Sequence, residues 1–221
     1  AYENAEPLNG VACSLWGWIY IVYGHSIIVL DHNRAYRGSY GHVIDHGNKN
    51  GPANKARFNE PIGIRFIGDT LLICDSENGQ IRAIETFTSN TRHIRPLVPI
   101  GKEGFGQQNL DLNQTAAGAH EEGTSWLGEV KLYSGGVIRQ FRDGPIESAL
   151  WKRPMDLAAG KFGNDSEAIF VLDGGTIRVI SLGMVITIAD NIETPLQPLF
   201  QGVFPNNFRP PAISLAVTGD F

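Results

Sequence analysis

The sequence of 221 residues contains 42% hydrophobic and 19% charged residues, enough apolar material for one globular core in a chain of this length. Its 26 glycines and 12 prolines exceed what a helical bundle uses and favour short strands joined by turns. The net charge of -5 disfavours a general binder of nucleic acid or of anionic membranes. Composition excludes these classes without naming a function.

The longest apolar stretch covers residues 15–30 and is interrupted at Gly24, His25 and Ser26. It is shorter than the ~20 residues that a membrane helix needs. Because it is rich in β-branched and aromatic residues, it predicts two strands joined by a tight turn at Tyr23-Gly24-His25. We therefore expect a hairpin and no membrane span.

The two cysteines, Cys13 and Cys74, are too few for a disulfide framework and lack the spacing of metal ligands. Each lies in an apolar run, so we expect buried free thiols. Glycosylation triplets begin at Asn113 and Asn164 and would be used only in a secreted protein. The chain starts at Ala1, so we expect a processed form or a fragment; the compartment stays open, and the triplets favour an extracellular one.

An internal repeat is the strongest pattern in the sequence. Residues 51–61 and 144–154 both read Gly-Pro-x3-Ala-x-aromatic-x2-Pro, ending at Pro61 and Pro154. Three short apolar strands separated by turns follow each of these prolines. Four-stranded units of about 40–50 residues are typical of propeller blades. The sequence therefore predicts an all-β fold, a β-propeller of four-stranded blades.

The predicted propeller is a single domain spanning residues 1–221, with about four blades and part of a fifth. The blades are placed at about 5–48, 51–97, 104–141, 144–190 and, in part, 200–221. We expect strands at 130–133 and 137–141 within the third of these blades. An incomplete blade leaves open sheet edges, so we expect an incomplete ring or a fragment of a larger propeller.

The two strong copies resemble the repeat of the NHL family of β-propellers. That repeat is similar to Gly-Pro-x3-Ala-x-Phe-x2-Pro-x-Gly-Ile-Ala, followed by an apolar strand ending in Asp, a turn and Ile-Arg. Residues 51–84 and 144–180 follow it closely, whereas 7–48 and 104–143 depart from it. NHL propellers usually have six blades, so the resemblance implies that further blades come from the same polypeptide or from a second chain.

Charged residues recur in the repeat. Asp75 and Asp173 end equivalent strands, and Arg82, Arg139 and Arg178 occupy Ile-Arg positions. Recurrence favours a structural role over a charged ring around a ligand, because a ligand site is rarely symmetric. We expect each Asp to cap the following turn and to pair with an Arg of the next strand.

A histidine cluster invites a metal interpretation, with His42 and His46 as the candidates beside Asp45. The spacing matches no standard ligand frame, and the flanking glycines Gly41 and Gly47 argue against a helix that would align the two rings. Exposed turn histidines are the favoured interpretation, and no cofactor is predicted.

Catalytic candidates are few on the predicted inner strands. His120, Asp156 and Arg65 could support acid–base chemistry, which leaves a metal-dependent lyase or hydrolase as an alternative function. No second histidine lies on an equivalent strand to complete a metal set, so an enzyme is not favoured.

The favoured function is a non-catalytic scaffold whose loops bind a protein or a glycan. Phe200, Phe204 and Phe208 are expected to anchor a protein interface or to pack under the last blade. A second alternative is a subunit or fragment of a larger assembly, in which another chain or another copy completes the ring by strand addition at 212–217.

A small basic and aromatic patch lies in the loop after the first hairpin. It consists of Arg34, Tyr36, Arg37 and Tyr40 and is the place to look for RNA binding. The acidic total and the absence of Lys/Arg runs disfavour nucleic acid as a partner.

Overall fold

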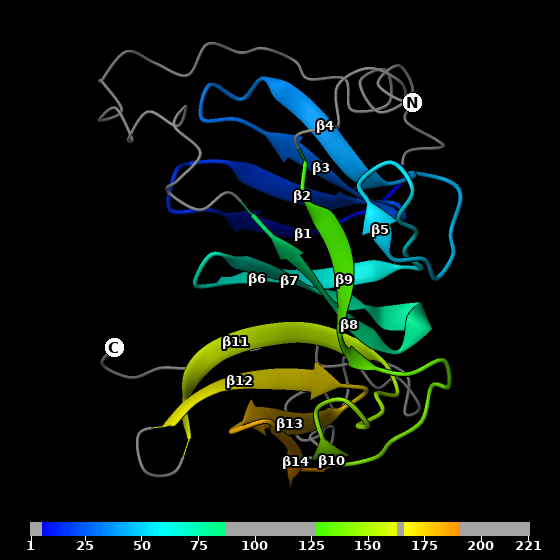
Figure 1. The fold of residues 1–221 in the computed structure, drawn as a ribbon, viewed down its shortest axis with the longest axis vertical. Helices are drawn as coiled ribbons and strands as arrows, with labels where there is room; N and C mark the ends of the chain where they lie inside the picture. Colours follow the sequence, from blue (N-terminus) through cyan, green and yellow to red (C-terminus); the bar gives the residue numbers. More distant parts are fainter. Residues whose placement is uncertain (1–5, 87–126, 163–165, 191–221) are drawn as a thin grey trace, which may run out of the picture.

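The computed structural model describes residues 6–86, 127–162 and 166–190. In these ranges the chain forms three antiparallel sheets of four or five strands and one short 3-10 turn, η1 (Ser76–Asn78). The sheets are stacked one upon another, with the first and third at opposite ends of the stack (Figure 1). The predicted all-β class is confirmed for the described residues. No helix within those three ranges is long and apolar enough to cross a membrane.

The first sheet is a simple meander in which each strand pairs with the next along the chain. Its strands are β1 (Leu8–Cys13), β2 (Ile19–Tyr23), β3 (Ser26–Leu30) and β4 (Tyr36–Gly41). The β2–β3 pair confirms the predicted hairpin, and Gly24 supplies the positive φ of 55° that its tight turn requires.

The second and third sheets share one plan, which adds a short outer strand to the meander. The second sheet contains β5 (Gly51–Pro52), β6 (Pro61–Ile67), β7 (Thr70–Asp75), β8 (Gln80–Glu85) and β9 (Glu129–Gly135). The third contains β10 (Gly144–Pro145), β11 (Pro154–Phe162), β12 (Ser166–Asp173), β13 (Thr176–Ser181) and β14 (Met184–Ala189). In both, the Gly-Pro dipeptide pairs with the fourth strand and the chain then crosses the sheet to its first strand.

The placement of residues 130–133 in the third predicted blade, 104–141, is wrong. They lie in β9, which is hydrogen-bonded to β8 as the fourth strand of the second sheet. The insertion between β8 and β9 separates β9 from the other strands of its sheet in the sequence, so the pairing of β9 with β8 cannot be recognised from the sequence. The strand expected at 137–141 is also wrong, because Val137 and Ile138 lie in a connection and are 90% and 60% exposed. The other proposed strands of 104–126 and 200–221 lie outside the described residues.

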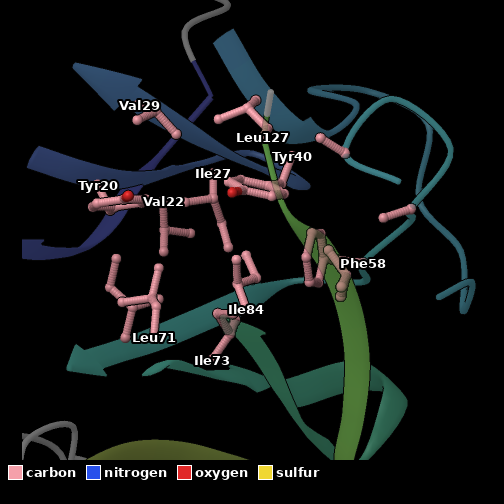
Figure 2. Packing of buried hydrophobic residues seen from close by; sticks show 14 residues of the cluster. Tyr20, Val22, Ile27, Val29, Tyr40, Phe58, Leu71, Ile73, Ile84 and Leu127 are labelled. Carbon is pink, nitrogen blue, oxygen red and sulfur yellow. The ribbon is translucent and has the colours of Figure 1, made fainter. Parts of the chain in front are cut away.

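Two apolar clusters hold the three sheets together. The first cluster fills the space between the first and second sheets, where Tyr20, Val22 and Ile27 face Leu71 and Ile73 (Figure 2). The second cluster joins the second and third sheets in the same way. Each sheet alternates side chains between its two faces, so the second sheet contributes one face to each cluster.

The first strands of neighbouring sheets approach each other closely at glycines. A Cβ atom on Gly63 of β6 would lie 2.5 Å from the carbonyl oxygen of Met155 in β11. Gly10 of β1 makes the same kind of approach to the carbonyl oxygen of Ile62. In the third sheet the position equivalent to Gly63 is occupied by Asp156. Only glycine leaves room for this spacing between strands.

A buried ion pair lies at the centre of the second sheet. Arg82 Nη1 is 2.9 Å from Asp75 Oδ2, and both side chains are fully buried. Arg82 also donates to the carbonyl oxygen of Lys49, while Asp75 accepts the backbone N–H of Asn59. Lys49 precedes β5 and Asn59 lies between β5 and β6, so the ion pair binds main chain on both sides of the Gly-Pro strand.

The third sheet repeats this arrangement around Arg178 and Asp173, whose charged atoms lie 3.1 Å apart. Arg178 donates to the carbonyl oxygen of Arg142, and Asp173 accepts the N–H groups of Lys152 and Arg153. The predicted pairing is thus present in both sheets. The predicted capping role is wrong for η1, because Asp75 makes no side-chain cap bond there.

The first sheet lacks the ion pair. Its registers place Tyr23 and Ile28 where the other two sheets carry Asp and Arg, and both side chains are buried in a third apolar cluster. The ion pair is therefore a feature of the second and third sheets, and apolar residues replace it in the first.

The two cysteines differ in environment, and both are free. Cys74 is buried in the cluster between the second and third sheets, as expected. The prediction is wrong for Cys13, which is exposed, because its side chain lies on the face of β1 that points away from the second sheet.

The variant Gly63→Val tests the close approach of β6 and β11. The new side chain would meet backbone atoms of Met155 and Asp156, which cannot rotate away, so we expect a loss of at least about 3 kcal/mol in the free energy of unfolding. Gly68→Ala is the control: the φ of Gly68 is positive, unlike that of Gly63, but its Cβ meets nothing within 4 Å, so only about 1 kcal/mol of backbone strain is expected. Urea unfolding that gave equal losses for both would contradict the packing described.

The variant Arg82→Leu tests the buried ion pair. It removes the cation that compensates the buried Asp75 carboxylate and leaves the hydrogen bonds of Arg82 unmade, so we expect a loss of about 3–5 kcal/mol in the free energy of unfolding. Lys131→Leu, which removes an exposed pair with Glu85, should cost less than about 1 kcal/mol. Adding Asp75→Asn to Arg82→Leu should restore part of the loss. A loss no larger than that of the Lys131 variant would refute the role assigned to the pair.

Candidate ligand-binding cleft

A cleft of about 670 Å³ opens between the second and third sheets. Its walls come from the end of β6, from β9 and from β11, β12 and β13. Volumes of ~300–1,000 Å³ are typical of sites for small ligands. Among the described residues, this cleft is our candidate site for binding a small ligand.

The cleft exists because two strands of the third sheet are longer than their equivalents. β11 has nine residues and β12 has eight, against seven in β6 and six in β7. The extra residues are 161–162 of β11 and 166–167 of β12, and the ring of Phe162 packs against that of Phe170 at 6.2 Å. Residues 159–161 and 167–169, at this end of the two strands, line the cleft.

The floor of the cleft is apolar, and its rim is polar. Ile146, Ile169 and Ile180 form the floor with the half-buried ring of Tyr133. Burial raises the pKa of the Tyr133 hydroxyl, so this group stays protonated at neutral pH and can donate a hydrogen bond.

The rim carries the charged side chains Lys161 and Glu167, opposite each other on β11 and β12, together with Ser181. Donors and acceptors thus surround an apolar surface. Such a site can bind and orient a ligand that has both apolar faces and hydroxyl groups. Sequence reasoning did not select these residues. One signal for the cleft was present in the sequence: the segment between the first two strands is longer in the second strong repeat, residues 159–168, than in the first, residues 66–71.

The structure does not place the catalytic candidates in this cleft. Asp156 lies near the start of β11, and its carboxylate accepts the N–H of Leu157. Arg65 is exposed on β6, and His120 lies outside the described residues. Acid–base chemistry by these three side chains thus has no assembled site in the part of the chain that is described.

The metal candidates lie in a surface loop. His42 Nδ1 accepts the backbone N–H groups of Ile44 and Asp45, so this nitrogen is used within the loop. The ring of His46 lies 5.4 Å from that of His25. No group of three potential ligand side chains is present in residues 6–86, 127–162 and 166–190.

The basic and aromatic patch is used for internal contacts. Arg37 donates from Nε and Nη2 to Asp31 Oδ2, at 2.8 and 2.6 Å. Although burial raises the pKa of Asp31, bonds from Arg37 and from the N–H groups of Ala35 and Asn33 hold it below its usual value. Tyr36 packs against the third apolar cluster, and Arg34 has a positive φ of 66° in the turn before β4.

The remaining site candidates do not reach the cleft or cannot be placed. Arg139, expected in a strand, lies in a connection and pairs with Glu77. Asp75, Arg82, Asp173 and Arg178 form the two ion pairs described above, and Pro61 and Pro154 begin β6 and β11. Outside the described residues lie Phe200, Phe204, Phe208, Asn113 and Asn164.

No protein-family model matches the chain, and no curated protein matches it. Among solved structures, it is similar to an auxiliary nutrient binding protein from Bacteroides thetaiotaomicron, with a TM-score of 0.50 and 13% identity over 81% of this chain and 35% of that one. It is also similar to an auxiliary nutrient binding protein from Bacteroides ovatus, with a TM-score of 0.49 and 14% identity over 83% of this chain and 36% of that one. The likeness is one of fold, and the chain spans about a third of the length of these structures.

The variant His25→Gln tests a pH-sensitive contact between the first two sheets. His25 Nδ1 accepts the N–H of Glu60 at 3.0 Å, and burial together with His46 holds the pKa of His25 below its ordinary value, against Glu6 and Glu60. Stability from this contact is present above the unfolded pKa of about 6.5 and is lost as the pH falls through the folded pKa. We therefore expect urea unfolding to show a smaller stability loss from pH 7.5 to pH 5 in the variant than in the wild type.

The exposed His32 provides the control, since His32→Gln should keep the wild-type response. Burial raises the pKa of Asp75 to about 6, which changes stability in the opposite sense over this range. Asp75 is common to all three proteins, so its contribution cancels in the comparison. An unchanged pH response in His25→Gln would contradict the assignment.

Proposed function

We propose that the three sheets are consecutive blades of an NHL-type β-propeller that serves as a non-catalytic binding scaffold. Three observations support the propeller. Each sheet contains a four-stranded antiparallel meander, the first strands of neighbouring sheets lie side by side at Gly10 and Gly63, and a Gly-Pro strand pairs with the fourth strand in the second and third sheets. Stacked meanders whose first strands face a common centre are the arrangement of propeller blades.

The ligand we propose for the cleft is an oligosaccharide. The observation that carries this is the combination of an apolar floor containing Tyr133 with a polar rim of Lys161, Glu167 and Ser181. Sugar rings have apolar C–H faces that pack on aromatic and aliphatic side chains, and hydroxyl groups that need donors and acceptors. The solved structure with the TM-score of 0.50 is described as a nutrient binding protein, which is the class of function proposed.

The variant Ala159→Phe tests this function. Ala159 lies on β11 in the wall of the cleft, so a phenyl ring there would occupy the space for the ligand. Isothermal titration with maltoheptaose, cellohexaose, mannohexaose and xylohexaose should show binding of at least one to the wild type. Ala159→Phe should weaken that binding by at least ~10-fold, whereas Ala35→Phe, on an exposed turn, should leave it unchanged.

Three outcomes would refute the proposal. Absence of binding for all four oligosaccharides would reject the ligand class, and equal weakening by both variants would reject the cleft as the site. Release of shorter sugars during incubation would favour the hydrolase or lyase alternative over a binding scaffold.

A further inference from the structure

Four hairpins among the described residues have turns of only two residues. These turns join β2 to β3, β6 to β7, β12 to β13, and β13 to β14. In each of them the first residue of the turn has a positive φ, between 49° and 59°. The twist of the paired strands favours turns of this kind, and glycine adopts the required backbone conformation without strain.

One of the four turns departs from this use of glycine. Glycine occupies the first position in three of them, as Gly24, Gly68 and Gly174. The turn between β13 and β14 has Leu182 there, with a φ of 49°, followed by Gly183 with a φ of 74°. Leucine is strained in this left-handed conformation, because its Cβ atom approaches the following carbonyl oxygen.

The fold gains little from the side chain of Leu182. This side chain is 86% exposed, and it belongs to none of the three apolar clusters that the described residues form. The turn is held by other contacts: Ser181 pairs with Met184, and the carbonyl oxygen of Gly183 accepts the N–H of Ile146 at 2.9 Å. These contacts involve only the backbone, so a turn with asparagine or glycine in place of the leucine would keep them.

The strained leucine lies in the wall of the cleft, next to Ser181 of its rim. Ile146, whose N–H binds the turn, belongs to the floor of the cleft, so the turn is fixed to the site. The turn at Gly68 lines the cleft from the second sheet and carries no side chain there. An exposed leucine is common on protein surfaces, but strained residues are concentrated at ligand-binding sites.

We propose that Leu182 is a ligand-binding residue of the cleft and packs against the apolar C–H face of a sugar unit. This inference rests on the proposed function of the cleft in binding an oligosaccharide. In the free protein the side chain of Leu182 is in water, whereas in the complex it is covered by the sugar. The apolar area removed from water then contributes to affinity, while the strain is present in both states.

The variant Leu182→Asn tests this role, because it should change stability and affinity in opposite directions. Asparagine tolerates a positive φ in such turns, so the Tm of the ligand-free protein should rise by about 2–4 °C. The ligand for isothermal titration is whichever of maltoheptaose, cellohexaose, mannohexaose and xylohexaose binds the wild type most tightly. Its affinity should fall at least ~5-fold in the variant, since the apolar contact is lost.

Two control variants separate the ligand contact from the strain. Leu182→Met keeps an apolar side chain of similar size in the same strained turn, so both its Tm and its affinity should stay close to those of the wild type. Val137→Asn removes an apolar side chain that is 90% exposed in a connection outside the lining of the cleft. It should change neither quantity.

A lower Tm for Leu182→Asn would overturn the proposal, because it would show that the leucine stabilises the fold. Wild-type affinity in Leu182→Asn, or an equal loss of affinity in Val137→Asn, would overturn it as well. These outcomes leave the cleft as a binding site and reject only the role of Leu182. A wild-type protein that binds none of the four oligosaccharides would instead refute the proposed function, and the sugar contact with it.

Discussion

The arrangement of the second and third sheets depends on one kind of interaction, a fully buried Asp–Arg pair that also binds main chain. A buried ion pair alone contributes little to stability, because desolvation of both charges offsets their attraction. Here Arg82 and Arg178 donate to carbonyl oxygens that precede the Gly-Pro strand of each sheet. Asp75 and Asp173 accept N–H groups that follow this strand. Most of the main chain in these segments has no strand partner. The pair thus satisfies polar groups that the fold must bury.

The first sheet shows that the meander itself does not require this pair. Tyr23 and Ile28 take the two positions with apolar packing. The exchange changes both partners together, which avoids leaving one charge unpaired in the interior. The backbone register is therefore shared by all three described sheets, while the residues at these two positions differ between them.

The sequence allowed prediction of the features that depend on local pattern. Alternation and turn residues located the first hairpin, and recurrence identified Asp75 with Arg82 and Asp173 with Arg178 as pairs. The assignment of β9 to the second sheet was not predictable, because its partner β8 is distant in the sequence. The local sequence of a strand does not indicate which strand it pairs with. Cys13 and the cleft were missed for a related reason: which face of β1 is covered, and how far β11 projects beyond β6, depend on the packing of whole sheets.

The separation of β9 from β8 also bears on how the protein is made. Until the ribosome has released residues beyond Leu127, β8 has an unpaired edge and the second sheet cannot be completed. β5 must wait as well, since it pairs with β9 alone. Contacts of such sequence separation form late and slow the search for the native state. While the second sheet is incomplete, its unpaired edge can bind strands of other chains, and this association competes with correct folding.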